Sequence, residues 1–443
     1  MKKIFILIFA TVYFISGFAQ IDPIPTTDVL AYNFTIEVND RNDSIIGTTT
    51  ITGKGTGYNN HLVLNLKNQD RTKKGMTVSS VTELNGKPLA YSQSNDVIDI
   101  NLNYKQNLYN YTLLIKYSGV PTNGLIIGQN KFGNRTWFGD NWPNRAQYWL
   151  PCIDNIADKA SVAWNVIAPS QYQVVANGLL QSKKECAVNT TCWHFVQSQP
   201  IPTKVMTIGI AELQKKCMLL RDSIEICNYY YPQTYAAQPN KMDVAKEVLI
   251  FFEKTIGTYP FDKLNNVQST TMFGGMENAN NIFYDEYAVD AQQSMEALIA
   301  HEVAHQWFGN TVTEADFSQL WLSEGFATFF TNYYLEIKYG VDTLQKRLKT
   351  DSVKVANFLR SKKIPVINTT TNYMSLLNAC SYEKGGLFLQ ALRTKLGDTV
   401  FFNGIKKYYS TYKYKNATTN DFKKVMEVIS KQNLTALFKY WLY

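Results

Sequence analysis

The chain of 443 residues lacks several features that define other classes of protein. Charged side chains make up 18% of it, and the net charge of +8 is spread along the sequence rather than gathered into a basic stripe. This distribution argues against nucleic-acid binding. No C-x-x-C pair occurs, so a cysteine-based metal site is not expected. The hydrophobic content of 45% and the absence of repeats indicate a globular protein, and the length favours two domains.

Long apolar runs are also missing, except at the amino terminus. Lys2 and Lys3 precede an apolar run over residues 4–18, and the small residues Gly17 and Ala19 would allow cleavage before Gln20. This is the anatomy of a secretory signal peptide, which we predict over residues 1–19. The run is shorter than the roughly 20 residues that a membrane-spanning helix needs. We therefore expect an exported chain, secreted or periplasmic, with no membrane anchor after processing.

Cysteine is scarce, at six residues. Cys186 and Cys192 flank one short polar stretch, and Cys217 and Cys227 enclose another segment in the same way. Each pair could close a short loop as a disulfide in an oxidising compartment. For the two remaining cysteines a buried thiol is an equally good interpretation; they are Cys152 and Cys380.

Histidine is scarcer still, yet two of the four histidines fall in one H-E-x-x-H motif made by His301, Glu302 and His305. Positions i and i+4 share one face of a helix, so the two imidazoles can bind one metal ion. Eighteen residues separate His305 from Glu324, a carboxylate in an otherwise apolar segment that needs a partner. Two histidines and one carboxylate, with a position left for water, form a catalytic zinc site. Glu302 is then placed to accept a proton from the water that zinc activates. A chance match on an ordinary amphipathic helix is the alternative, and the placement of Glu324 argues against it.

The hydrophobic pattern divides the chain in two. Short alternating runs, such as the one with Phe34, Ile36 and Val38, occupy residues 28–213 and predict an all-β domain of sandwich or saddle type. After Cys227 helical periodicity takes over. We therefore predict an α+β chain with an amino-terminal β domain over residues 20–213 and a catalytic domain over residues 214–443. Within the latter, the sequence suggests the following elements: a helix ending near Gly257, a strand over 265–273 that ends at Gly274–Gly275, helices over 342–358, 382–396 and 421–429, and a final apolar helix that packs partly on its own domain.

At this point the second half resembles the gluzincin aminopeptidases, the family of aminopeptidase N and leukotriene hydrolase. Three ordered motifs carry the resemblance in the second half: GGMEN at 274–278, HEVAHQWFGN followed by LWLSEGFA, and YEKGG at 382–386. Upstream, WLPCID at 149–154 resembles the end of the core of the family's amino-terminal β domain. It implies a thermolysin-like zinc peptidase domain, one zinc ion per chain held by His301, His305 and Glu324, and peptide substrates with a free amino terminus.

The resemblance also assigns roles to residues that spacing alone would not reveal. The edge Gly274, Gly275 and Met276 would pair with the substrate backbone, and Glu277 would receive the free α-amine as a charge-assisted hydrogen bond. Tyr382 would donate its hydroxyl to the developing oxyanion, sharing that charge with zinc.

One departure from the family pattern concerns the amine. The family often has a Gln or Glu before the P-C-x-D segment that also touches the amine; here Asp140, Asn141 and Trp142 stand near that place, and Asp140 is the candidate.

Rival functions use the same residues. An endopeptidase or an epoxide hydrolase could be built on this zinc site, and a catalytically inactive protein could bind peptides through the surface of the β domain. Degenerate relatives would be expected to lose Glu302, Tyr382 or a zinc ligand, and all of these are present. The sequence leaves the side-chain preference and the oligomeric state open.

Overall fold

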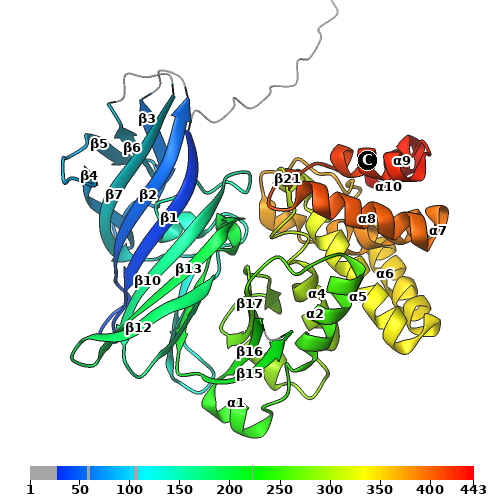
Figure 1. Cartoon of the computed structure of the whole chain (residues 1–443), viewed down its shortest axis with the longest axis horizontal. Helices are drawn as coiled ribbons and strands as arrows, with labels where there is room; N and C mark the ends of the chain where they lie inside the picture. Colours follow the sequence, from blue (N-terminus) through cyan, green and yellow to red (C-terminus); the bar gives the residue numbers. More distant parts are fainter. Residues whose placement is uncertain (1–26, 57–59, 104–107, 222) are drawn as a thin grey trace, which may run out of the picture.

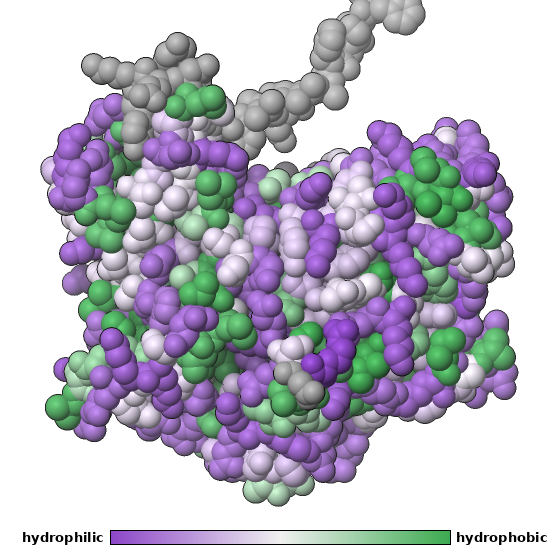
Figure 2. Space-filling view, viewed as in Figure 1, coloured by the Kyte–Doolittle hydropathy of each residue, from purple (hydrophilic) through white to green (hydrophobic). Residues whose placement is uncertain are grey.

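The computed structural model describes residues 27–56, 60–103, 108–221 and 223–443, so the predicted signal peptide lies outside the described residues. Figure 1 shows the strands of the first half as one body beside the helices of the second half. No described helix combines the length and apolar character needed to cross a membrane. On the face shown in Figure 2, apolar residues are scattered among hydrophilic ones.

A seven-stranded sheet forms the frame of the first domain, in the order β12-β13-β10-β1-β2-β7-β4. The alternation of apolar and polar residues that predicted strands is confirmed here, because Phe34, Ile36 and Val38 are all buried. A parallel pairing of β1 with β10 joins two antiparallel halves of the sheet. The strands are β1 (Thr27–Glu37), β2 (Ile45–Thr56), β4 (Gly75–Glu83), β7 (Leu108–Val120), β10 (Lys159–Pro169), β12 (Leu179–Ala187) and β13 (Thr190–Pro202).

Two smaller sheets complete this domain. One has the order β11-β14-β9-β8 and the other the order β3-β6-β5. Trp149, which follows β9, stacks on Trp164 of the large sheet at 5.8 Å between ring centroids, and both rings are fully buried. The strands are β3 (His61–Asn65), β5 (Tyr91–Ser94), β6 (Val97–Asn101), β8 (Leu125–Gln129), β9 (Arg135–Gly139), β11 (Gln173–Ala176) and β14 (Ile208–Ala211).

A five-stranded sheet, β15-β16-β17-β19-β18, begins the second half. Its strands are β15 (Gln214–Leu220), β16 (Ile224–Tyr230), β17 (Lys263–Ser269), β18 (Gly275–Met276) and β19 (Asn281–Asp285). The expected strand over 265–273 is wrong at its end. β17 stops at Ser269, and Gly275–Met276 return as a separate strand antiparallel to β19. The reason is that the Thr271 hydroxyl and the Met272 N–H bond to the Asp140 side chain instead of a neighbouring strand.

Helices make up the rest of the catalytic domain (Figure 1). The sequence analysis did not predict α1, α3 or α8, whereas the helices that it did predict are present within a few residues. The helices are α1 (Pro232–Ala237), α2 (Val244–Thr255), α3 (Glu286–Asp290), α4 (Glu296–Ala304), α5 (Trp321–Tyr339), α6 (Val341–Ser361), α7 (Gly385–Leu396), α8 (Asp398–Tyr412), α9 (Thr419–Ser430) and α10 (Thr435–Leu442). A π-helical turn at Cys380–Lys384 leads into α7, and β20 (Thr313–Glu314) pairs with β21 (Asn416–Ala417).

The last helix, α10, packs on its own domain, as the sequence analysis predicted. Leu434 and Leu442 are fully buried, and the Phe438 ring lies 4.8 Å from the ring of Phe388 on α7. The fold class is confirmed: an all-β domain is followed by an α+β catalytic domain.

The cysteines pair as the spacing suggested. Disulfides join Cys186 to Cys192 across the β12–β13 hairpin and Cys217 to Cys227 across β15 and β16. Cys152 and Cys380 are buried free thiols.

Candidate metal centre and active site

Helices α4 and α5 bring the three predicted metal ligands together. The Nε2 atoms of His301 and His305 lie 3.2 Å apart, one helical turn from each other. Glu324, in the first turn of α5, places Oε2 at 3.2 Å from Nε2 of His301 and 3.3 Å from Nε2 of His305. Three ligand atoms on two packed helices therefore converge on one point.

The protonation state of this cluster fits a zinc ion. Nδ1 of His305 lies 3.1 Å from the carbonyl oxygen of Phe308, which can only accept a hydrogen bond, so Nδ1 carries the proton. The Nε2 lone pair of His305 then faces His301 and Glu324. Burial alone would raise the pKa of Glu324, but the two neighbouring imidazoles, with His305 contributing most, lower it, so the carboxylate is ionised. Converging lone pairs and a buried negative charge need a cation, and this donor set suits zinc.

Glu302 lies beside the cluster and is buried. Burial raises its pKa well above the usual range; His305 counteracts this, while the carboxylates of Glu277 and Glu324 add to it. A carboxylate with a raised pKa is suited to accept and release a proton near neutral pH.

Gly275 is the residue that makes room for Glu302. A Cβ at position 275 would fall 2.3 Å from Oε1 of Glu302, whereas a Cβ at Gly274 would meet no atom within 4 Å. Of the two glycines, Gly275 is therefore the one at which a side chain would collide with its neighbour. The sequence analysis assigned both glycines to the approach of a substrate and missed this contact, because Gly275 is on strand β18 and Glu302 is on helix α4.

Glu277 lies at the same cavity with an unsatisfied carboxylate. Its main-chain carbonyl accepts hydrogen bonds from Gln306 Nε2 at 3.1 Å and Asn310 Nδ2 at 2.6 Å, which fixes the backbone. The residue is 6% exposed, and its Oε1 has no hydrogen-bond partner among the described residues.

Tyr382 stands over the cluster from the π-helical turn, with its ring stacked on that of His301 at 5.9 Å. Burial raises the pKa of its hydroxyl well above the usual value, and Glu324, Glu277 and Glu302 add to the shift, so the group stays protonated. Its placement depends on a close helix crossing: a Cβ on Gly325 of α5 would lie 2.9 Å from the Cα of Gly385. The first glycine of YEKGG thus lets α7 approach α5.

The cavity that joins these groups has a volume of about 310 Å³. All nine predicted site residues line it. Its walls are Trp142, Phe273, Gly274, Gly275, Met276, Glu277, Leu298, His301, Glu302, His305, Glu324, Leu377 and Tyr382.

Comparison with known families assigns the two halves of the chain. The profile of the peptidase M1 N-terminal domain matches residues 29–205, and that of the peptidase family M1 domain matches residues 240–441. The chain belongs to peptidase family M1. The resemblance seen in the motifs is thereby confirmed, and the cofactor of this zinc metallopeptidase family is the ion that the site fits.

Similar proteins place the chain within this family. It is 28% identical to glutamyl aminopeptidase of Sus scrofa in a match 320 residues long that covers 68% of this chain and 34% of that protein. It is 29% identical to mitochondrial aminopeptidase 2 of Saccharomyces cerevisiae in a match 378 residues long that covers 75% of this chain and 37% of that protein. The chain thus spans about a third of the length of these curated relatives.

Among solved structures, the fold is similar to that of an M1 zinc metallopeptidase from Deinococcus radiodurans. The TM-score is 0.80 at 22% sequence identity, and the match covers 95% of this chain and 94% of the other.

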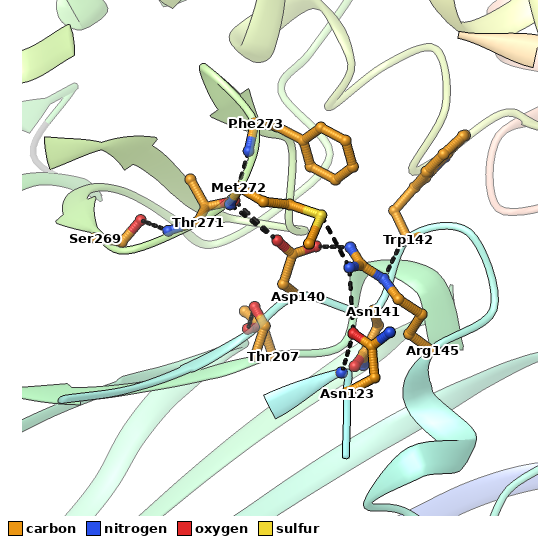
Figure 3. A network of polar contacts seen from close by, with 12 residues as sticks. Asn123, Asp140, Asn141, Trp142, Arg145, Thr207, Ser269, Thr271, Met272 and Phe273 are labelled. Atoms are coloured by element: carbon orange, nitrogen blue, oxygen red, sulfur yellow. Dashed lines mark hydrogen bonds and ion pairs between the residues drawn. The ribbon is translucent and has the colours of Figure 1, made fainter. Parts of the chain in front are cut away.

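In this M1 peptidase the three β-domain residues near the expected amine contact have different environments. Trp142 lines the cavity, whereas Asp140 and Asn141 do not. Asn141 Nδ2 donates to the Thr203 and Met206 carbonyls, and its Oδ1 accepts from the Trp149 indole. These hydrogen bonds all lie within the β domain. Asp140 is engaged by Arg145 and Thr271 (Figure 3). The structure therefore does not place Asp140 at the amine position suggested by the resemblance.

Proposed function

We propose that this M1 peptidase is an exported aminopeptidase that removes the amino-terminal residue of peptides. The observation that carries the proposal is Glu277, a buried carboxylate with an unpaired oxygen beside the cavity that holds the metal ligands. A buried anion of this kind calls for a cation, and the α-ammonium group of a peptide supplies one. An amine held at Glu277 would set the first peptide bond beside the metal ligands, which line the same cavity.

The chain's own groups divide the reaction among them. His301, His305 and Glu324 would hold zinc, which when bound polarises the scissile carbonyl and acidifies water. Glu302 takes the proton from the attacking water and returns it to the leaving amine.

Residues around the metal ligands position the substrate and stabilise the negative charge that develops on the carbonyl oxygen. Glu277 fixes the amine, and the edge from Gly274 to Met276 lies along the peptide backbone. The protonated Tyr382 hydroxyl donates a hydrogen bond to the carbonyl oxygen as negative charge develops on it.

Similar proteins support peptides as substrates. The curated relatives are named aminopeptidases, and a variant of the Deinococcus radiodurans enzyme was solved with the tripeptide Tyr-Ser-Ala. The proposal carries this substrate class over to the present chain.

Export is the second part of the proposal. It rests on the signal-peptide anatomy of residues 1–19, and two disulfides of the kind that persist in oxidising compartments support it. The secreted or periplasmic protein should begin at Gln20 when its amino terminus is sequenced. Retention in the cytoplasm with residue 1 intact would contradict export and leave the enzymatic proposal untouched.

The test of the activity is a matched pair of substrates. Aminoacyl fluorogenic substrates and peptides should be cleaved with a free amine and resist cleavage when N-acetylated. A chelator should abolish turnover and added zinc restore it. Internal cleavage of acetylated peptides would favour an endopeptidase, and zinc-loaded protein that cleaves neither set would favour a peptide-binding role.

A further inference from the structure

Asp140 and Arg145 form a buried ion pair at the boundary between the two domains (Figure 3). Asp140 directly follows β9, and its side chain is 1% exposed, against 7% for Arg145. The Arg145 guanidinium contacts Oδ1 of Asp140, and its Nε donates to the Trp142 carbonyl at 2.6 Å. Both partners belong to the β domain and lie within one six-residue segment, 140–145, in which the Arg145 N–H donates to the Asn141 carbonyl at 2.7 Å.

The other oxygen of Asp140 reaches into the catalytic domain. Oδ2 accepts hydrogen bonds from the Thr271 hydroxyl at 3.0 Å and from the Met272 N–H at 3.4 Å. Arg145 adds a contact of 3.1 Å from its Nη1 to the Met272 Sδ. The segment that leaves β17 and leads to Gly274 is thus fastened to the β domain by its side chains and its backbone.

The pair also fixes the two aromatic walls of the cavity, one from each domain. Trp142 lies between Asp140 and Arg145 in the sequence, and its carbonyl is bound by Arg145. The Arg145 guanidinium lies 5.6 Å from the centroid of the Phe273 ring. Trp142 and Phe273 meet edge to face at 6.0 Å. Arg145 of the ion pair thus contacts both of these cavity walls.

We propose that Asp140 and Arg145 form a brace that positions the substrate-binding edge, with Asp140 acting through Thr271 and not by touching the substrate. Both Asp140 oxygens already have partners, and Asp140 is absent from the residues that line the cavity. The edge it holds continues directly into Gly274, Gly275, Met276 and Glu277. The kinetic consequence rests on the proposed aminopeptidase function, whereas the structural consequence does not.

Thr271→Val is the decisive variant, because it keeps the shape of the side chain and removes only the hydroxyl. An edge that contacts the substrate equally in the ground and transition states affects KM rather than kcat. KM for a free-amine peptide should rise about two- to tenfold, the range of one lost hydrogen bond, with kcat within about twofold. Thr271→Ser should restore KM. Thr191→Val removes a buried hydroxyl in the large sheet of the β domain and should leave KM unchanged.

The Asp140→Asn variant distinguishes a brace from a direct contact between Asp140 and the substrate amine. A brace predicts that Asp140→Asn and Thr271→Val raise KM in the same way and keep the preference for free over N-acetylated peptides. If Asp140 touched the amine, Asp140→Asn would erase that preference and Thr271→Val would not, which would overturn the proposal.

Hydrogen–deuterium exchange tests the brace without turnover. Amides of residues 272–276 should exchange faster in Thr271→Val and Asp140→Asn than in the wild type, and Thr271→Ser should protect them again. This readout stands even if the wild type cleaves no peptide, so failure of the proposed activity is distinguishable from failure of the brace. Unchanged exchange in Thr271→Val would refute the brace.

Discussion

Lys204 of the β domain and Glu314 of the catalytic domain form an ion pair at 2.5 Å in which neither side chain is exposed to solvent. Glu314 Oε2 has no hydrogen-bond partner among the described residues, and Lys159 Nζ donates nearby to the Thr311 and Lys415 carbonyls. The pair therefore ties the two domains together close to the loop that follows α4.

Removing one partner should be costly. Lys204→Met leaves the Glu314 charge buried without its partner, and we expect the free energy of unfolding to fall by about 3–5 kcal/mol. Adding Glu314→Leu should recover most of that loss, since two apolar groups tolerate burial. Denaturant unfolding of the two variants and the wild type measures both effects. A single variant as stable as the wild type would contradict this account.

Glu302→Gln should separate proton transfer from metal binding. The amide keeps the size of the side chain and the space beside Gly275, but it cannot accept the proton. We expect one zinc ion per chain by elemental analysis, as in the wild type, and nearly complete loss of turnover. His305→Ala is the contrasting variant and should lose the zinc itself. A Glu302→Gln enzyme with nearly normal kcat would contradict the role of Glu302 in proton transfer.

Tyr382→Phe should lower kcat with little change in KM, because the hydroxyl meets charge that develops only in the transition state. By analogy with a lost oxyanion donor, the cost is about 3 kcal/mol, roughly a hundredfold in kcat. The ring keeps its stacking on His301, so the fold and the zinc content should not change. Unaltered kcat would assign Tyr382 to packing.

The sequence predicts the metal site well because its signal is local. The spacing of His301 and His305 on one helix needs no knowledge of distant contacts, and Glu324 follows on the next helix. What the sequence missed depends on segments that meet only in the folded chain. β17 ends early because Thr271 and Met272 bond to Asp140, more than a hundred residues away. Gly275 is needed for Glu302, and Gly385 for the crossing with α5, yet neither neighbour is visible in the local pattern.

Glu277→Ala should weaken free-amine substrates selectively. Losing a charge-assisted hydrogen bond to a buried carboxylate costs about 1.5–3 kcal/mol in kcat/KM. The advantage of free over N-acetylated peptides should narrow by the same factor, since the acetylated ones never used that contact. Glu277→Gln, which keeps the shape and loses the charge, should fall between the wild type and alanine. Equal losses on free and acetylated peptides would point to a packing role.

Lys263 should make the stability of the protein depend on pH in a known direction. Its ammonium group is buried against the Ala176 carbonyl at 2.7 Å, and burial lowers its pKa to about 7, with Glu225 opposing and Lys215 adding to the shift. In the unfolded chain the pKa returns to about 10.4, so above pH 7 the folded state binds fewer protons than the unfolded state.

The cost of burying the charged Lys263 side chain is therefore fully present below pH 7. It falls as the pH rises from 7 toward the pKa that Lys263 has in the unfolded chain. We expect the free energy of unfolding of the wild type, relative to Lys263→Met, to increase by up to about 1.4 kcal/mol per pH unit between pH 7 and 9. Lys184→Met, which changes an exposed lysine on β12, should give no such pH-dependent difference. Urea unfolding of the three proteins across this range provides the measurement. A difference between wild type and Lys263→Met that stays constant, or falls as the pH rises, would mean that Lys263 remains charged in the folded protein.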